Sequence, residues 1–97
     1  MVEHVVLFKV KSGVASEAVA EMIAALRGLR DQVPGIADLT VGANFSDRNQ
    51  GYTHGLVVRF RDKAALEAYL PHAAHQAAVQ KCIRPIVDDV LVVDYEI

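Results

Sequence analysis

The chain has 97 residues, a net charge of −2 and 53% hydrophobic residues, which indicates one domain over residues 1–97 and argues against nucleic acids or acidic membranes as partners. Its single cysteine, Cys82, excludes an internal disulfide and is typical of a reducing compartment. Because no apolar run approaches the ~18 residues of a membrane span, and the opening MVEHVVLFKV lacks a basic leader and a cleavage site, we expect a cytoplasmic protein without a signal peptide.

The first half of the chain predicts a strand, a helix and a second strand. VEHVVLFKV, from residue 2, is rich in β-branched side chains and predicts the first strand. Residues 16–33 carry apolar side chains at helical spacing, with Ser16 as the expected N-cap and a Pro-Gly pair as the stop. Residues 36–45 then alternate, which predicts a strand. Four of its side chains should share one face: Leu39, Val41, Ala43 and Phe45.

The second half predicts a hairpin partner, two short helices and a closing strand. After the turn-rich SDRNQG, residues 52–60 (YTHGLVVRF) alternate as the third strand. We expect Asp62 to cap a short helix that contains Tyr69. A third helix follows and ends at Pro85, and residues 90–97 (VLVVDYEI) predict the fourth strand.

This β-α-β-β-α-β order predicts an α+β fold of the ferredoxin-like type, with a four-stranded antiparallel sheet and the helices on one face. Helices can cover only one face of the sheet, so the other face would leave an apolar patch exposed. The patch consists of Val5, Leu7, Val57, Leu91 and Val93. We expect a second copy of the chain to cover it in a homodimer with the sheets face to face. The alternative is that a different protein binds there.

Side chains that can carry chemistry should gather between the sheet and the helices. His4 shares its strand face with Val6 and Phe8. His54 shares its strand face with Leu56 and further apolar side chains. Because these are the bulkier faces of their strands, both histidines are predicted to point toward the helices.

The stretch YLPHAAH, residues 69–75, places three more such groups above one end of the sheet: Tyr69, His72 and His75. A buried histidine or tyrosine without a partner costs about 1–3 kcal/mol, so these groups should bond to one another, to water or to a ligand. The residues leave three interpretations open. Tyr69 and His75 could transfer protons on a bound organic molecule, since imidazole titrates near neutrality and a phenol can donate a hydrogen bond. His72 and His75 with His4 or His54 could bind a metal, or the histidines could cap helices and fill a polar core.

Four segments carry a family resemblance that covers nearly the whole chain in order. They are HVVLFKVK at 4–11, VPGIADLTVG at 33–42, GYTHGLVVRFRDKAALEAYLPHAAH at 51–75 and VLVVDYEI at 90–97. Together they resemble the stress-responsive A/B barrel domain family, which implies a dimeric α+β barrel. The family includes boiling-stable plant stress proteins and olivetolic acid cyclase, a polyketide cyclase in which a tyrosine and a histidine perform acid–base catalysis between helices and sheet.

The resemblance implies specific site residues in this chain. The catalytic tyrosine corresponds to Tyr69 and the catalytic histidine to His75, while pocket-lining histidines correspond to His4 and His54. In this chain a proline precedes His72 instead of following it, and no tryptophan is present. We therefore expect a reshaped pocket and a substrate other than a long alkyl polyketide.

We expect a small stress-response-type dimer that binds a small organic molecule between helices and sheet, with Tyr69 and His75 as the catalytic pair. The predicted ligand-binding residues are His4, Val6, Phe8, His54, Leu56 and His72. As an enzyme it would perform cyclase- or lyase-type chemistry on a carbonyl or polyketide-like substrate, and we assign it no cofactor or metal ligand. The alternatives are a non-catalytic stress-associated dimer and, by fold analogy alone, a cofactor-free oxygenase.

Overall fold

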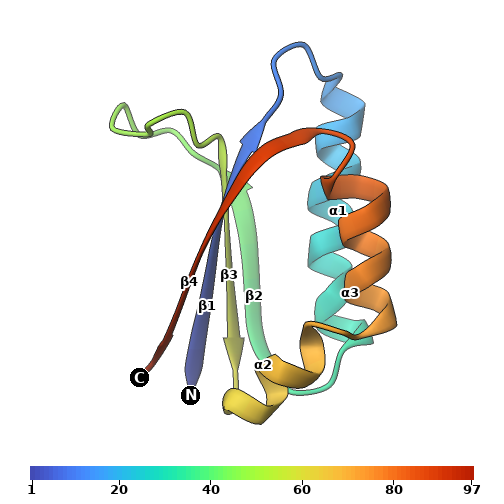
Figure 1. Cartoon of the computed structure of the whole chain (residues 1–97), viewed down its shortest axis with the longest axis vertical. Coiled ribbons are helices and arrows are strands. Elements are labelled where there is room, and N and C mark those ends of the chain that lie inside the picture. Colours follow the sequence, from blue (N-terminus) through green and yellow to red (C-terminus); the bar gives the residue numbers. More distant parts are fainter.

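The computed structural model describes residues 1–97 as one sheet with helices packed on one of its faces (Figure 1). In chain order the elements are β1 (Val2–Val10), α1 (Ser16–Gln32), β2 (Ile36–Ala43), β3 (His54–Phe60), α2 (Lys63–Tyr69), α3 (Ala73–Ala78), a π-helical segment η1 (Val79–Ile83) and β4 (Val87–Glu96). The strand order is β2-β3-β1-β4, and each neighbouring pair is antiparallel. This arrangement confirms the predicted ferredoxin-like α+β fold.

The two faces of the sheet differ in what covers them. The inner face meets the helices, and there β3 buries Leu56, Val58 and Phe60 while the alternate side chains of that strand stay open to solvent. Met22 and Leu26 of α1 belong to the same buried cluster. Each such side chain contributes about 1.5–3 kcal/mol when it leaves water. The outer face, which looks away from the helices, has no covering layer within the chain.

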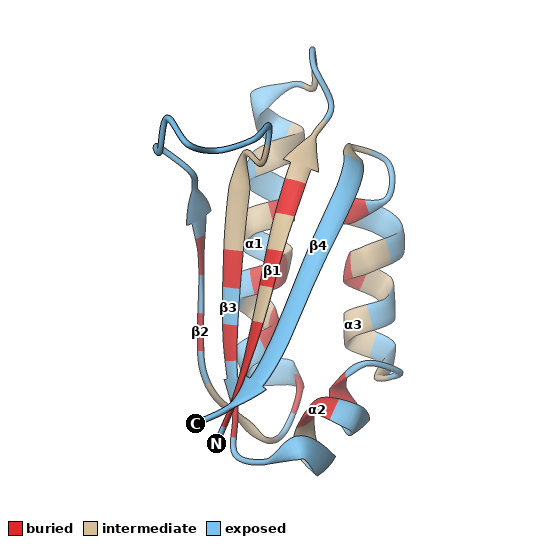
Figure 2. Cartoon of the chain, turned by 60° about the vertical axis from the view of Figure 1, so that its left-hand side comes forward, coloured by how far each residue is buried: buried red, intermediate tan, exposed pale blue.

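β4 is the most exposed element of the sheet, as Figure 2 shows along nearly its whole length. It pairs with β1 so that Val6 lies opposite Val92 and Leu7 opposite Leu91. The predicted outer patch is therefore on one face, with Val5 and Leu7 half-buried. Its other three members are more exposed: Val57, Leu91 and Val93.

The helix starts follow the sequence prediction in one case and depart from it in another. Asp62 caps α2, because its Oδ1 accepts a hydrogen bond from the Ala65 N–H at 2.8 Å. Ser16 does not cap α1: it is the first helical residue, and Ala15 occupies the cap position without any side-chain bond. The extended backbone of Ala15 brings its carbonyl oxygen within 3.0 Å of the Ala18 nitrogen, so the helix starts one residue earlier than a serine cap would allow.

The hairpin between β2 and β3 is shorter than predicted. β2 ends at Ala43, so the prediction that Phe45 shares a strand face with Leu39 and Val41 is wrong: Phe45 lies beyond the strand and is fully exposed. The turn starts early because Asn44 Oδ1 accepts a hydrogen bond from the Ser46 N–H at 2.9 Å, which draws the chain out of the sheet. β3 correspondingly begins at His54, two residues later than its alternation predicts.

Candidate functional site

A cavity of about 210 Å³ lies between the inner face of the sheet and the helices. Its walls come from β1, β3, β4, α1, α2, α3 and η1. The lining residues are His4, Val6, Phe8, Leu26, Leu56, Tyr69, Leu70, His75, Val79, Ile83, Val90 and Val92. Most ligand pockets measure about 300–1,000 Å³, so this cavity suits a compact molecule better than a long one. Its walls are apolar except for the three titratable side chains, which therefore dominate its chemistry.

Tyr69 and His75 lie against each other at this cavity. Their ring centroids are 4.2 Å apart with 40° between the ring planes. Tyr69 is the last residue of α2 and is only 1% exposed. Burial raises the pKa of the Tyr69 hydroxyl to about 12, so the phenol is neutral at pH 7 and can donate a hydrogen bond.

The protonation of His75 is set by the chain turn that precedes α3. His75 Nδ1 lies 2.9 Å from the Leu70 carbonyl oxygen, and a carbonyl can only accept, so Nδ1 carries the proton. In the neutral ring the other nitrogen, Nε2, then has a free lone pair. Burial lowers the pKa of His75 from 6.5, the hydrogen bond to Leu70 opposes this, and the charges of His4 and His72 add to the lowering. His75 is therefore a neutral base at physiological pH.

His4 enters the same cavity from β1 and is held by a residue that the sequence prediction missed. His4 Nδ1 lies 2.5 Å from Oδ1 of Asp94 on β4, and the histidine is 4% exposed. The His4 ring stands edge-on to Tyr69 with centroids 5.9 Å apart. Asp94 has the same parity as Val90 and Val92, but its pairing with His4 depends on the register between β1 and β4. A single sequence does not specify that register.

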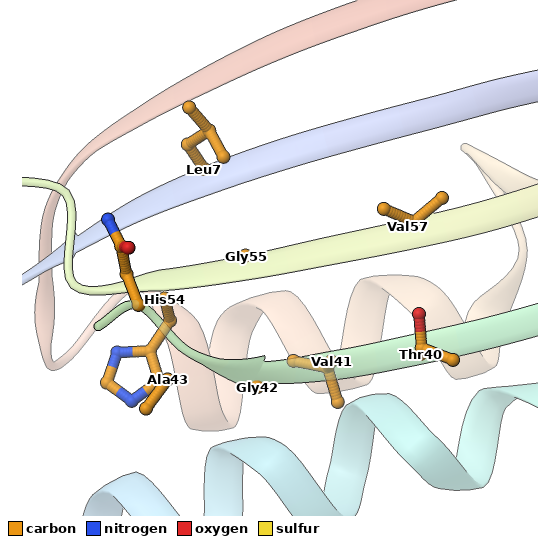
Figure 3. A pocket seen from close by; sticks show the side chains of 9 residues that line it. Leu7, Thr40, Val41, Gly42, Ala43, His54, Gly55 and Val57 are labelled. Carbon is orange, nitrogen blue, oxygen red and sulfur yellow. The ribbon is translucent and has the colours of Figure 1, made fainter. Parts of the chain in front are cut away.

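Two of the predicted ligand-binding residues do not reach the cavity. His54 points to the helix side of the sheet (Figure 3), yet it lies at the far end of β3, where its Nδ1 is 2.9 Å from the Thr53 hydroxyl. His72 is the N-cap of α3, where its Nδ1 accepts a hydrogen bond from the Ala74 N–H at 3.1 Å. The other predicted residues, among them Val6, Phe8 and Leu56, line the cavity.

The histidines are also too dispersed for the metal interpretation. No group of three or more histidine, cysteine, aspartate or glutamate side chains is placed so that it could hold a metal ion. His72 commits its Nδ1 to a helix cap, and His54 stands apart from the cavity. The polar groups of the cavity therefore fit proton transfer better than metal ligation.

A family model described as the Stress responsive A/B Barrel Domain matches residues 2–97. The chain belongs to this family. Stress-response A/B barrel domain-containing protein HS1 of Arabidopsis thaliana is 33% identical over 97 residues, which cover 98% of this chain and 88% of HS1. A longer stress-response A/B barrel domain-containing protein of the same plant is 33% identical over 95 residues, which cover 97% of this chain. That match covers only 36% of the longer protein, so this chain spans about a third of its length.

Several solved structures superpose closely on this chain. An Arabidopsis thaliana protein has a TM-score of 0.90 at 32% identity, with 99% of this chain and 94% of that chain covered. Several neighbours are described as dimeric ferredoxin-like proteins of unknown function. One of them, from Jannaschia sp. CCS1, has a TM-score of 0.78 at 35% identity and covers 99% of this chain and 98% of its own.

Hydroxynitrile lyase from Passiflora edulis also shares the fold, with a TM-score of 0.87 and coverage of 97% of this chain and 90% of that chain. Its identity to this chain is 20%, so the likeness concerns the fold alone. None of the helices here is both long and apolar enough to cross a membrane.

Proposed function

We propose that this chain binds a small carbonyl compound in the inner cavity and transfers a proton on it with His75 and Tyr69. The observation that carries the proposal is the hydrogen bond from His75 Nδ1 to the Leu70 carbonyl beside a buried, neutral Tyr69. It assigns a base and a hydrogen-bond donor to one apolar cavity. General acid–base pairs of this kind accelerate proton transfer by about 10²–10⁴-fold.

In the proposed reaction, His75 Nε2 takes a proton from the carbon next to the carbonyl group. The electrons of that C–H bond move to the carbonyl oxygen, and the Tyr69 hydroxyl donates a hydrogen bond to the resulting enolate. The enolate carbon can then attack a second carbonyl carbon of the same molecule, and the proton on His75 returns to the new alkoxide. The apolar walls exclude water, which strengthens the hydrogen bond to the enolate. His4, held by Asp94, packs edge-on against Tyr69 and helps to position it.

The cavity volume restricts the substrate class. A volume of about 210 Å³ admits a compact ketone or a short diketone, whereas a long alkyl chain would have to extend past the edge strand β4. Val90 and Val92 of that strand line the cavity and are also exposed, so they form its entrance side. The proposed substrate is therefore a small cyclic or short-chain carbonyl compound.

Binding can be tested with cyclohexanone as the probe, by following backbone amide signals in ¹H–¹⁵N NMR spectra. The expected result is a saturable shift of signals from Val6, Leu56 and Val90, with no shift at Leu7 on the outer face. The variant Val92→Phe should fill the cavity and remove the shift. Shifts confined to the outer face, or none at millimolar probe, would contradict the proposed site.

A second candidate function, a non-catalytic stress-associated dimer, is favoured by one observation. His72 and His75 both satisfy backbone groups around the start of α3, which is also what a purely structural role requires. The two functions differ in the consequence of Tyr69→Phe. That change removes the hydroxyl oxygen from a buried ring. A purely structural role predicts that it changes the free energy of unfolding and leaves proton transfer on a bound ketone unaffected.

We also propose that the chain forms a homodimer through the outer face of its sheet. Three solved structures of similar fold, at 25–35% identity, are described as dimeric, which supports this assembly. The face exposes Val57, Leu91 and Val93, and β4 offers an unpaired edge. In a twofold dimer this patch would pack against the same patch of a second copy.

An ion pair on the outer face, in which Glu3 is buried and Arg59 is exposed, also supports the dimer. Glu3 Oε1 accepts hydrogen bonds from Arg59 Nε at 2.8 Å and from Arg59 Nη2 at 2.5 Å. The other carboxylate oxygen of Glu3 is buried without a partner. An unpaired buried oxygen is costly, and a second chain on this face would be a source of the missing donor.

A further inference from the structure

The loop between β2 and β3, residues 44–53, projects away from the helices beyond the outer face of the sheet (Figure 1). It carries Phe45, whose relative exposure is 101%. The loop has a defined shape, because Asn44 and Asn49 accept hydrogen bonds from the Ser46 and Gly51 N–H groups at 2.9 and 2.7 Å. We call residues 44–53 the arm. The Phe45 side chain of the arm has no partner within its own chain, because it is fully exposed.

The outer face contains an open hollow of about 520 Å³ beside the base of the arm. Its floor is formed by Gly42 of β2 and Gly55 of β3, which lie opposite each other in the sheet. Figure 3 shows the side chains of Leu7, Thr40 and Val57 rising around this floor on the side away from the helices. The hollow exists because the two facing residues have no side chains.

Nothing within the chain requires glycine at these two positions. Neither Gly42 nor Gly55 has a positive φ angle. A Cβ on Gly42 would meet no heavy atom within 4 Å, and a Cβ on Gly55 would meet only Leu7 Cδ2 at 3.8 Å, an ordinary contact. Glycine in a strand often marks a site where a ligand or another backbone approaches closely. A group from another chain that approaches this floor would account for the pair.

The hollow and the exposed phenylalanine are adjacent: Asn44 lines the hollow, and Phe45 is the next residue. In a twofold dimer both partners present the same surface. If the axis passes between Phe45 and the hollow, it places the Phe45 of each protomer at the hollow of the other protomer. The occupant is then a second copy of this chain. An aromatic ring on an apolar floor is also the usual anchor of an interface.

We propose that Phe45 of each protomer inserts into the Gly42–Gly55 hollow of the other protomer, so that the two arms hold the dimer together. This inference rests on the proposed homodimer and adds a specific, reciprocal contact to it. The contact also assigns a role to two features, the exposed aromatic side chain and the facing glycines, that the inner cavity does not use.

The test is a double-mutant cycle on the dimer dissociation constant, measured by analytical ultracentrifugation of the full chain. Phe45→Ala should raise the dimer Kd at least about 30-fold, as truncation of an interface anchor does. Gly42→Leu places a side chain in the hollow, its Cβ meets no heavy atom within 4 Å in its own protomer, and the change should raise the Kd similarly. The double variant should be no weaker than the weaker single variant, because both changes remove the same contact. Phe45→Leu, which keeps an apolar side chain, should cost less than Phe45→Ala.

The outcomes separate this contact from the dimer itself. A wild-type chain that is monomeric at all concentrations overturns both the homodimer and the contact. A dimeric wild type whose Kd is unchanged by Phe45→Ala overturns the contact alone. Additive effects of Phe45→Ala and Gly42→Leu also overturn it, since Phe45 would then meet the partner elsewhere. Phe45 is fully exposed in its own protomer, so far-ultraviolet circular dichroism should show the Ala variant to be folded.

Discussion

The Leu70 carbonyl accepts two hydrogen bonds, one from His75 Nδ1 and one from Gln76 Nε2, each at 2.9 Å. This carbonyl belongs to the turn between α2 and α3, so the bend of the backbone is what orients the imidazole. Tyr69 is the residue just before the same turn. Two residues with complementary proton chemistry are thus fixed by one short piece of backbone, which is why their relative position does not depend on long side-chain contacts.

The pH dependence of stability follows from the histidines. Burial lowers the pKa of both His54 and His75 below 6.5, so the unfolded chain binds more protons than the folded chain near that pH. Their contribution to stability is complete above 6.5 and is lost as the pH falls through the lowered values. Urea denaturation at pH 7.5 and 5.5 should therefore show a smaller acid-induced loss of unfolding free energy in His75→Asn than in the wild type. An equal or larger loss in the variant would contradict this assignment.

Asp94 is expected to stabilise the fold through its bond to the buried His4. Asp94→Ala leaves the His4 nitrogen without its partner and should lower the free energy of unfolding by about 1–3 kcal/mol. Asp94→Asn keeps an acceptor and should cost less. The matched control is Asp88→Ala, an exposed carboxylate on the same strand. Urea denaturation that shows no difference between Asp94→Ala and the control would mean that the bond contributes nothing to stability.

At the scale of the elements, one wall of the cavity contains a change of helix type. The sequence predicts one regular helix that ends at Pro85. Instead α3 ends at Ala78, and η1 continues with a wider turn in which the Arg84 N–H bonds to the Val79 carbonyl at 2.9 Å. Val79 and Ile83, at the two ends of η1, both line the cavity. A π-helical turn has no sequence pattern as regular as that of the α-helix, so its position could not be predicted.

The helix caps offer a paired test at this scale. Asp62 accepts a bond from the Ala65 N–H, whereas Ser16 makes no cap bond. Asp62→Ala should therefore destabilise the chain by about 0.5–2 kcal/mol, and Ser16→Ala should change stability by less than about 0.5 kcal/mol. Chemical denaturation measures both changes. A larger effect of Ser16→Ala would mean that Ser16 does cap α1, as the sequence pattern predicts.

Sequence periodicity predicted the strands and the first helix because side chains that alternate or recur every three to four residues report which face is buried. It placed Tyr69 and His4 on the inner face for the same reason, whereas His75 was expected only above one end of the sheet. It placed His54 on that face too, but periodicity carries no information on how far along a strand a residue lies from a cavity. The partner of His4 and the end of β2 depend on strand register and on the Asn44 turn, which are settled by tertiary contacts.

At the scale of the whole molecule, the two faces of the sheet have different surroundings. The inner face of the sheet holds the cavity, and the outer face exposes Val57, Leu91 and Val93 to whatever covers it. The two share strands but not side chains, because residues on β1, β3 and β4 alternate between the faces. Changes on the outer face should therefore alter assembly without removing the groups that line the cavity.

Leu91→Asp tests the proposed assembly. The aspartate would place an unpaired charge inside the interface, so it should convert the dimer to a monomer. Leu91 is 44% exposed in the isolated chain, so the protomer itself should tolerate the change. Sedimentation should show the loss of the dimer, and circular dichroism should show a retained fold. A variant that remains dimeric would place the interface on another surface.

The most direct test of the proposed chemistry is the exchange of the α-hydrogens of cyclohexanone for deuterium in D₂O, followed by ¹H NMR. Exchange reports proton removal even when no further reaction occurs. The wild type should accelerate exchange above the buffer rate, and His75→Asn and Tyr69→Phe should each reduce that acceleration by about 10²–10⁴-fold. Tyr52→Phe, the same change at a tyrosine that does not line the cavity, should have no effect. Exchange at the buffer rate in the wild type, or equal rates in the wild type and both cavity variants, would contradict acid–base chemistry on a small ketone in this cavity.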